Sequence, residues 1–154
     1  MARPCPVWLP VVALSLILSL GRPDDARAAD RVYAVDGGCG GRPATTVRTA
    51  PGYCLGLVWQ GAGGEGPRMP RGLLPLDGGD WLVTDLGGWE PGRGAVWRLS
   101  FDQGGAPRWR RLVRGLSMPH TAARGPDGRI YVSEMNRILT LDPDAADPAA
   151  TVRT

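Results

Sequence analysis

The sequence predicts an all-β fold built from β-propeller blades. Residues 70–85 recur in outline at residues 119–134, an offset of 49 residues. Both copies run from proline and a basic or imidazole residue through a small apolar stretch to Asp-Gly, an apolar triplet and a carboxylate. No sustained helical apolar period occurs beyond residue 28. A repeat of about 40–50 residues with several short strands is typical of propellers, although a plain β-sandwich with two similar hairpins is an alternative.

Each copy of the repeat is expected to form a four-stranded antiparallel unit. Asp-Gly supplies the positive-φ turn that joins the first two strands of a hairpin. The large apolar triplet after each turn fits a pleated, half-buried surface. Three further short strands are predicted at residues 95–100, 112–116 and 137–141.

Residues 1–28 have the pattern of a secretory signal peptide. Arg3 precedes an apolar run from Leu9 to Leu20, and Ala26 and Ala28 are the small residues that signal peptidase reads, so cleavage after Ala28 is expected. As a helix the run would span about 18 Å, well short of a bilayer core of about 30 Å. An uncleaved anchor and a buried helix are the alternatives. The mature protein is therefore expected to be periplasmic or secreted, without a stable membrane anchor.

The remaining residues amount to one domain at most. Residues 29–66 are expected to be loop-rich, with an irregular glycine string at 37–41 and one strand at 53–60. Residues 67–154 are expected to form an incomplete propeller domain.

The predicted blades occupy about residues 67–116 and 117–154. Propellers close with about 4–8 blades, and two alone would leave open sheet edges. We therefore expect the chain to be the N-terminal part of a longer protein. The alternative is a short chain that completes its ring with a second chain.

The charge pattern gives no reason to expect a nucleic-acid partner. The net charge is +3, and all 18 basic residues are arginine. The only cluster is Arg108, Arg110 and Arg111, which we interpret as the solvated face of a strand.

Two cysteines, Cys39 and Cys54, follow the signal segment. An even number in an oxidising compartment predicts a disulfide, which would contribute about 3 kcal/mol in the chain-entropy model. Free or differently paired thiols are the main alternative. A zinc site would need four ligands, and His120 is the only histidine.

Four motifs stand out between about residues 53 and 143: Pro70-Arg71-Gly72-Leu73, Thr84-Asp85-Leu86-Gly87-Gly88-Trp89, Pro119-His120 and residues 125–134. In these motifs the chain resembles the sorbosone and soluble glucose dehydrogenase family of quinoprotein propellers. The resemblance implies a six-bladed propeller that binds pyrroloquinoline quinone, usually with calcium, and oxidises a sugar or related alcohol or aldehyde. A histidine base in a later blade would take the hydroxyl proton. His120 matches an earlier Pro-His pair, and Thr121 stands where the family often has glycine. No catalytic residue is therefore assigned to this chain.

Arg71 and His120 occupy equivalent positions of the repeat and are the candidate cofactor-binding residues. Inner strands of a propeller line its channel, so Arg71 could hold a cofactor carboxylate there. The structural alternative is that each residue satisfies a backbone carbonyl at a blade junction.

The sequence also predicts a structural or a binding role for two carboxylates and three tryptophans. Asp85 and Glu134 follow the second strand of each copy and are expected to cap turns rather than to act as acid or base. Trp89, in a glycine-rich loop, is the best candidate for a sugar-stacking platform. Trp81 and Trp97 are expected in the core.

Three functions are compatible with these patterns. The first is an exported quinoprotein sugar dehydrogenase with pyrroloquinoline quinone and calcium, acting on a small sugar-like substrate. The second is a non-catalytic exported propeller that binds a protein or a glycan, because fold does not fix function. The third is a calcium-dependent lactonase. It rests only on Glu65-Gly66-Pro67, which sits 16 residues before Trp81 with an apolar segment between, a spacing that points to coincidence.

Overall fold

The computed structural model describes residues 34–61 and 65–154, so the predicted signal peptide lies outside the described part. The structure is mostly β, as the sequence predicts. Apart from strands, the described residues form two single 3-10 turns, η1 (Asp77–Gly79) and η2 (Pro148–Thr151). Within the described ranges, no helix has the length and apolar character needed to cross a membrane.

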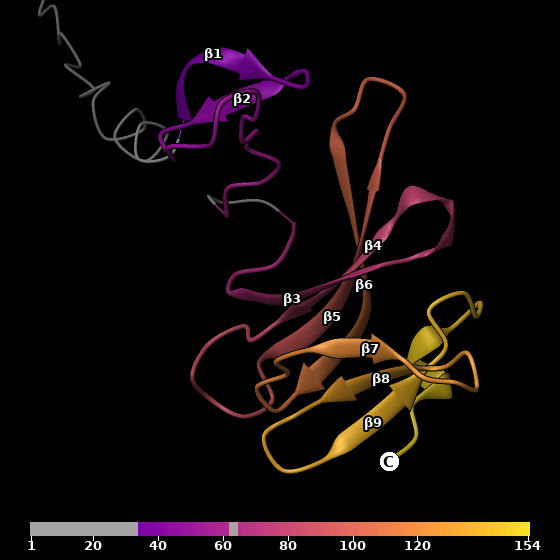
Figure 1. Ribbon diagram of the computed structural model, residues 1–154. Helices are drawn as coiled ribbons and strands as arrows, with labels where there is room; N and C mark the ends of the chain where they lie inside the picture. The colour runs from indigo at the N-terminus through magenta and orange to yellow at the C-terminus, as the bar shows by residue number, and fades with distance from the viewer. Residues whose placement is uncertain (1–33, 62–64) are drawn as a thin grey trace, which may run out of the picture. The chain divides into compact units, whose positions relative to one another are not determined.

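The first repeat forms a four-stranded antiparallel sheet (Figure 1). Its strands β3 (Pro70–Pro75), β4 (Trp81–Asp85), β5 (Gly94–Phe101) and β6 (Pro107–Leu116) pair in chain order. The strands predicted from composition are therefore confirmed here, although β5 and β6 extend further than expected.

The second repeat forms a three-stranded antiparallel sheet of β7 (Ala122–Arg124), β8 (Ile130–Ser133) and β9 (Ile138–Leu141). The chain then returns beside β9, where Thr140 and Arg153 exchange two backbone hydrogen bonds of 2.8 and 3.0 Å. This bridge occupies the place of a fourth strand, so both repeats follow the same meander.

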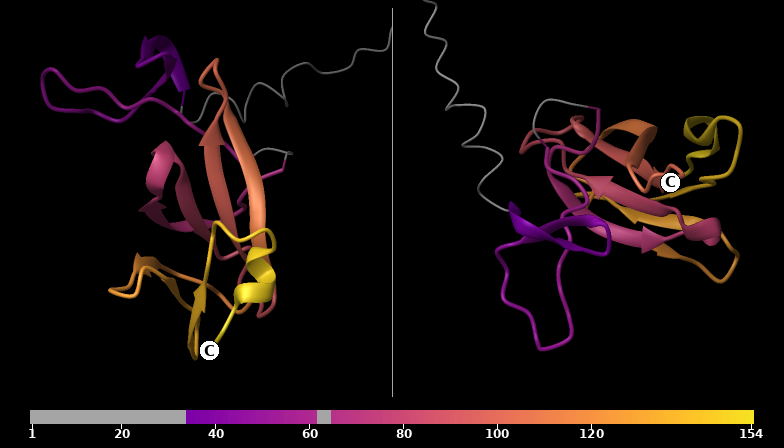
Figure 2. Two further views of the ribbon diagram at one scale, coloured as in Figure 1. Left: turned by 90° about the vertical axis from the view of Figure 1, so that its right-hand side faces the viewer. Right: turned by 90° about the horizontal axis from the view of Figure 1, so that it is seen from above.

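The two sheets share one hydrophobic core. Alternate residues along β8 and β9 are buried and exposed, as expected for strands with one covered face. The other residues, such as Tyr131 and Ile138, are 37% and 63% exposed. In Figure 2 the strands β7–β9 lie against the four-stranded sheet. The core residues from the two sheets are Leu76, Leu82, Val96, Leu112, Val113, Leu116, Ile130, Val132, Leu139 and Leu141.

The repeat also recurs in individual hydrogen bonds. The Thr84 hydroxyl accepts from the backbone N–H of Gly72 at 2.9 Å. In the second sheet the Ser133 hydroxyl accepts from the N–H of Thr121 at 3.2 Å. Both residues of the second pair lie 49 positions after their counterparts in the first. The sequence repeat is thus a repeat of local structure.

The N-terminal segment differs from the expectation. The glycine string at 37–41 was predicted to be irregular, and this was wrong: β1 (Ala34–Cys39) and β2 (Arg42–Thr45) form a hairpin. Gly40 and Gly41 have φ values of 59° and 76°, which suit the two-residue turns of hairpins.

The strand predicted at residues 53–60 is also wrong for most of its length. Only Gly56 makes a ladder contact, an isolated bridge to Ala44. Tyr53 is 77% exposed, so the apolar side chains that suggested a strand do not share a buried face. The predicted disulfide between Cys39 and Cys54 is confirmed.

Candidate functional site

Arg71 lies in the first strand of one sheet, and His120 lies just before the first strand of the other. Arg71 is the second residue of β3, and His120 lies two residues before β7. The hydroxyl of Thr84 joins the two segments, because it accepts from Gly72 N–H and donates to the carbonyl oxygen of His120, both at 2.9 Å. Both side chains are exposed. The structure thus brings the two residues to the edge where β3 of the first sheet meets the start of β7 in the second.

The backbone at this edge leaves no room for a side chain at position 72. A Cβ on Gly72 would lie 2.8 Å from Oγ1 of Thr84 and 3.0 Å from the carbonyl oxygen of His120. Real Cβ atoms essentially never come as close as 2.8 Å to another heavy atom, and 3.0 Å to a backbone oxygen is already tight, so glycine permits this approach. Gly72 therefore allows the first strands of the two sheets to meet.

His120 sits on a fixed backbone. Its N–H donates to the carbonyl of Ser133 at 3.0 Å, while its own carbonyl is held by Thr84. Pro119 is fully buried, and Met118 has φ 51°, which is uncommon for a residue other than glycine. Such a conformation costs about 1–3 kcal/mol and persists where the surroundings fix it. Both backbone groups of His120 are thus hydrogen-bonded, and the residue itself is exposed.

Arg71 contacts the exposed ring of Trp89. The guanidinium carbon lies 5.5 Å from the ring centroid, and Trp89 is 72% exposed on the loop between β4 and β5. A cation–π contact at an exposed site is worth about 0.5–1 kcal/mol. The loop position predicted for Trp89 is confirmed, and its pairing with Arg71 adds an aromatic surface to the edge.

This edge has the chemistry of a binding surface. Arg71 offers several N–H donors in one plane, which match a carboxylate. Among residues 34–61 and 65–154, no side chain hydrogen-bonds the His120 imidazole, so nothing described there orients it as a base. The same residues contain no group of three or more His, Cys, Asp or Glu that could hold a metal ion.

Asp85 caps a turn, as predicted. Its carboxylate is 3% exposed and accepts from the backbone N–H groups of Arg68, Met69 and Gly87 at 2.7–3.1 Å. The indole N–H of Trp97 donates to the second oxygen at 3.3 Å. Because it already accepts four hydrogen bonds, this carboxylate has a structural role.

Glu134 repeats this role in the second sheet. Its side chain is fully buried, accepts from Ser117 N–H at 2.5 Å, and pairs with Arg137. Ser117 and Glu134 lie 49 residues after Arg68 and Asp85, so the capping bond is part of the repeat. Both predicted turn-capping roles are therefore confirmed.

The two strand tryptophans behave differently. Trp97 is buried at 7% exposure, as predicted for a core residue, but Trp81 is 37% exposed and is not a core residue. Trp81 opens β4 at the end of the sheet, where fewer neighbours cover it. Sequence reasoning missed Thr84, because nothing local shows that a buried hydroxyl will bridge two sheets.

No protein-family model matches this chain, and comparisons with curated proteins and with solved structures found no match.

Proposed function

We propose that this chain supplies two consecutive blades of an exported β-propeller of the quinoprotein sugar dehydrogenase type. In this proposal the edge formed by β3 and the start of β7 contributes to the wall of the central channel. The observation that carries the proposal is the Thr84 bridge, which places Arg71 and His120 on one edge of two sheets with the same meander. First strands that meet side by side are what a propeller requires around its axis.

The exposed side chains at this edge fit part of the implied cofactor. Pyrroloquinoline quinone is a planar quinone with carboxylate groups, and it supplies the two-electron acceptor of the reaction when bound. Arg71 would hold a carboxylate, and Trp89 offers a flat surface beside it. The described residues do not fit calcium, since no suitable group of ligands occurs among them. In this proposal, calcium ligands and the catalytic base come from outside the described residues.

A non-catalytic propeller that binds a glycan is the second candidate. The observation that favours it is the exposure of Trp89, since an exposed indole is a usual stacking surface for sugar rings. The two candidates differ in the charge of the ligand, because only the quinone needs Arg71 as a counter-charge.

Titration of the 154-residue chain with pyrroloquinoline quinone, followed by tryptophan fluorescence, tests the proposal. We expect saturable quenching that Arg71→Gln weakens by about 10-fold or more, since a charge-assisted pair is lost. Arg114→Gln, an exposed arginine on β6, is the matched control and should leave the affinity unchanged. Absence of quinone binding, or equal losses in both variants, would overturn the proposal.

Two further measurements separate the candidates. Binding of a neutral oligosaccharide that is lost in Trp89→Ala but kept in Arg71→Gln would support the glycan-binding alternative instead. The chain alone should not oxidise sugars, even with quinone and calcium supplied, because no catalytic base is assigned to it. Turnover comparable to a complete dehydrogenase would contradict this assignment.

A further inference from the structure

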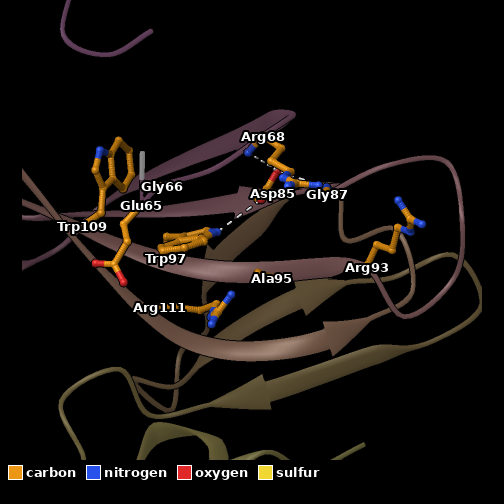
Figure 3. A pocket seen from close by; sticks show the side chains of 10 residues that line it. All are labelled: Glu65, Gly66, Arg68, Asp85, Gly87, Arg93, Ala95, Trp97, Trp109 and Arg111. Carbon is orange, nitrogen blue, oxygen red and sulfur yellow. Dashed lines mark hydrogen bonds between the residues drawn. The ribbon is translucent and has the colours of Figure 1, made fainter. Parts of the chain in front are cut away.

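The four-stranded sheet carries a second polar feature on the face opposite the shared core. A cleft of about 600 Å³ lies over β4, β5 and β6 (Figure 3). This face has its own small apolar cluster, which contains Val83, Ala95, Trp97 and Leu99 and excludes the residues of the shared core. Neither Arg71 nor His120 lines the cleft, so it is a different site from the edge that carries those two residues. Its charged lining residues are Glu65, Arg68, Asp85, Arg93 and Arg111.

Three arginines line this cleft, and their positive charge is poorly compensated. Arg93 pairs with Glu90 at 2.6 Å, but both side chains are more than half exposed, so the pair is weak. Arg68 and Arg111 form no ion pair with any residue in the described part of the chain.

The two carboxylates of the cleft do not cancel this charge. Asp85 is buried and already binds four N–H donors. Glu65 lies within 4 Å of no arginine nitrogen among the described residues. A cleft lined by arginines whose positive charge is not compensated by nearby carboxylates favours the binding of an anion.

One arginine is held in place by a chain of contacts. The indole N–H of Trp97 donates to Asp85, which fixes the ring. The guanidinium carbon of Arg111 lies 5.3 Å from the centroid of that ring. Figure 3 shows Trp97 and Arg111 side by side on adjacent strands. A stacked guanidinium loses little freedom on binding and keeps its planar set of donors, which suits a carboxylate or a phosphate.

The aromatic walls strengthen this arrangement. Trp97 is 7% exposed, and Trp109 stands edge-on to it with ring centroids 6.5 Å apart. The two rings give the open cleft an apolar wall beside Arg111, against which the non-polar part of a ligand can pack. The volume also lies within the range of about 300–1,000 Å³ that small-molecule sites occupy.

We propose that this cleft is a binding site for a small organic anion, recognised through a carboxylate or phosphate group by Arg68 and Arg111. The site is independent of the proposed quinone-binding edge, because it shares no residue with it. Arg93 lies at the other end of the cleft and can release Glu90 to meet a second anionic group.

Binding is measured by tryptophan fluorescence and calorimetry at constant ionic strength, with citrate and inorganic phosphate as separate probes. Glucose is the neutral control. We expect at least one of the two anions to bind saturably and glucose not to bind. Which anion binds more tightly distinguishes the carboxylate source from the phosphate source.

Three variants make the test decisive. Arg111→Gln and Arg68→Gln should each weaken binding by about 10-fold. Arg108→Gln lies on the same strand but outside the cleft, and it should change the affinity by less than about two-fold. If Arg111→Gln fails to fold, Arg68→Gln decides, since its exposed side chain makes no ion pair with a described residue. Absence of saturable binding of either anion, or an equal loss in all three variants, would overturn the proposal.

Discussion

Asp85 is the residue whose removal should disturb the first sheet most. Its buried carboxylate accepts from three backbone N–H groups and from the indole of Trp97. Asp85→Ala leaves all four donors without this acceptor. Water can take the place of the carboxylate for the N–H groups of Arg68 and Met69, whose hydrogen bonds are only partly buried. The hydrogen bonds from Gly87 and Trp97 are buried, so water cannot replace the carboxylate there.

The size of the effect follows from these two buried donors. Each unsatisfied buried donor costs about 1–3 kcal/mol, so with two of them we expect Asp85→Ala to lower the free energy of unfolding by about 2–6 kcal/mol. Asp85→Asn keeps one acceptor oxygen but turns an amide group toward a donor, and it should cost about 1–2 kcal/mol. The total free energy of unfolding of a small domain is only about 5–15 kcal/mol, so a loss of this size is a large part of it.

Urea unfolding followed by tryptophan fluorescence measures both variants, with the disulfide kept oxidised. The m values should match that of the wild type, so that shifts in the midpoint report stability. Asp102→Ala is the control. That carboxylate also accepts two backbone N–H bonds, from Gly104 and Ala106, but in an exposed turn where water replaces it. Asp102→Ala should therefore lose much less free energy of unfolding than Asp85→Ala.

The reasoning fails if Asp85→Ala unfolds at the wild-type urea concentration with an unchanged m value. It also fails if Asp85→Ala and Asp102→Ala are destabilised equally, because burial would then not decide the cost. An Asp85→Asn variant less stable than Asp85→Ala would show that the amide is a worse occupant than a small cavity.

Leu139→Ala should cost about 2–5 kcal/mol because Leu139 is fully buried between the sheets, whereas Ile138→Ala, at a position 63% exposed, should cost less than about 1 kcal/mol by the same urea assay. Replacing both cysteines of the disulfide by serine should cost about 3 kcal/mol, measured by thermal unfolding without reductant, and an unchanged transition would contradict this. The hydrogen bond to Asp127 raises the pKa of Tyr131 above its ordinary value of 10.0, so this contact stabilises the fold below pH 10 and is lost as the pH rises through the raised value. Tyrosinate absorbance of the wild type minus that of Tyr131→Phe checks it, and a titration at or below the ordinary value would contradict it. N-terminal sequencing of exported protein should begin directly after Ala28, and a sequence beginning at Met1 would rule out cleavage.

Local signals were enough to predict most strands of the two larger sheets. The Asp-Gly pair before β8 forms the expected turn, with Gly128 at φ 79°, because this conformation depends on a single residue. The hairpin at residues 34–45 was missed because its glycines resemble a loop, and its turn geometry is visible only once the strands pair. Trp81 was misplaced because composition does not reveal how near a residue lies to the end of a sheet.

The candidate site was only partly predictable for the same reason. The repeat placed Arg71 and His120 at equivalent positions, but their juxtaposition depends on Thr84, which lies 36 residues before His120. No local pattern reports a hydrogen bond of that span. The anion-binding cleft was not predicted at all, because its arginines come from three separate parts of the chain.

The sequence by itself predicted most strands of the two larger sheets, the repeat, the turn-capping carboxylates and, as the favoured pairing, the disulfide between Cys39 and Cys54. These features depend on backbone preferences, side-chain alternation and residue counts, which are properties of short segments. Only the tertiary structure decided which faces of the sheets are buried together, that Trp89 lies against Arg71, and that Arg111 stacks on Trp97. Such contacts depend on how strands far apart in the chain are aligned, and a shift of one residue would turn each side chain to the opposite face.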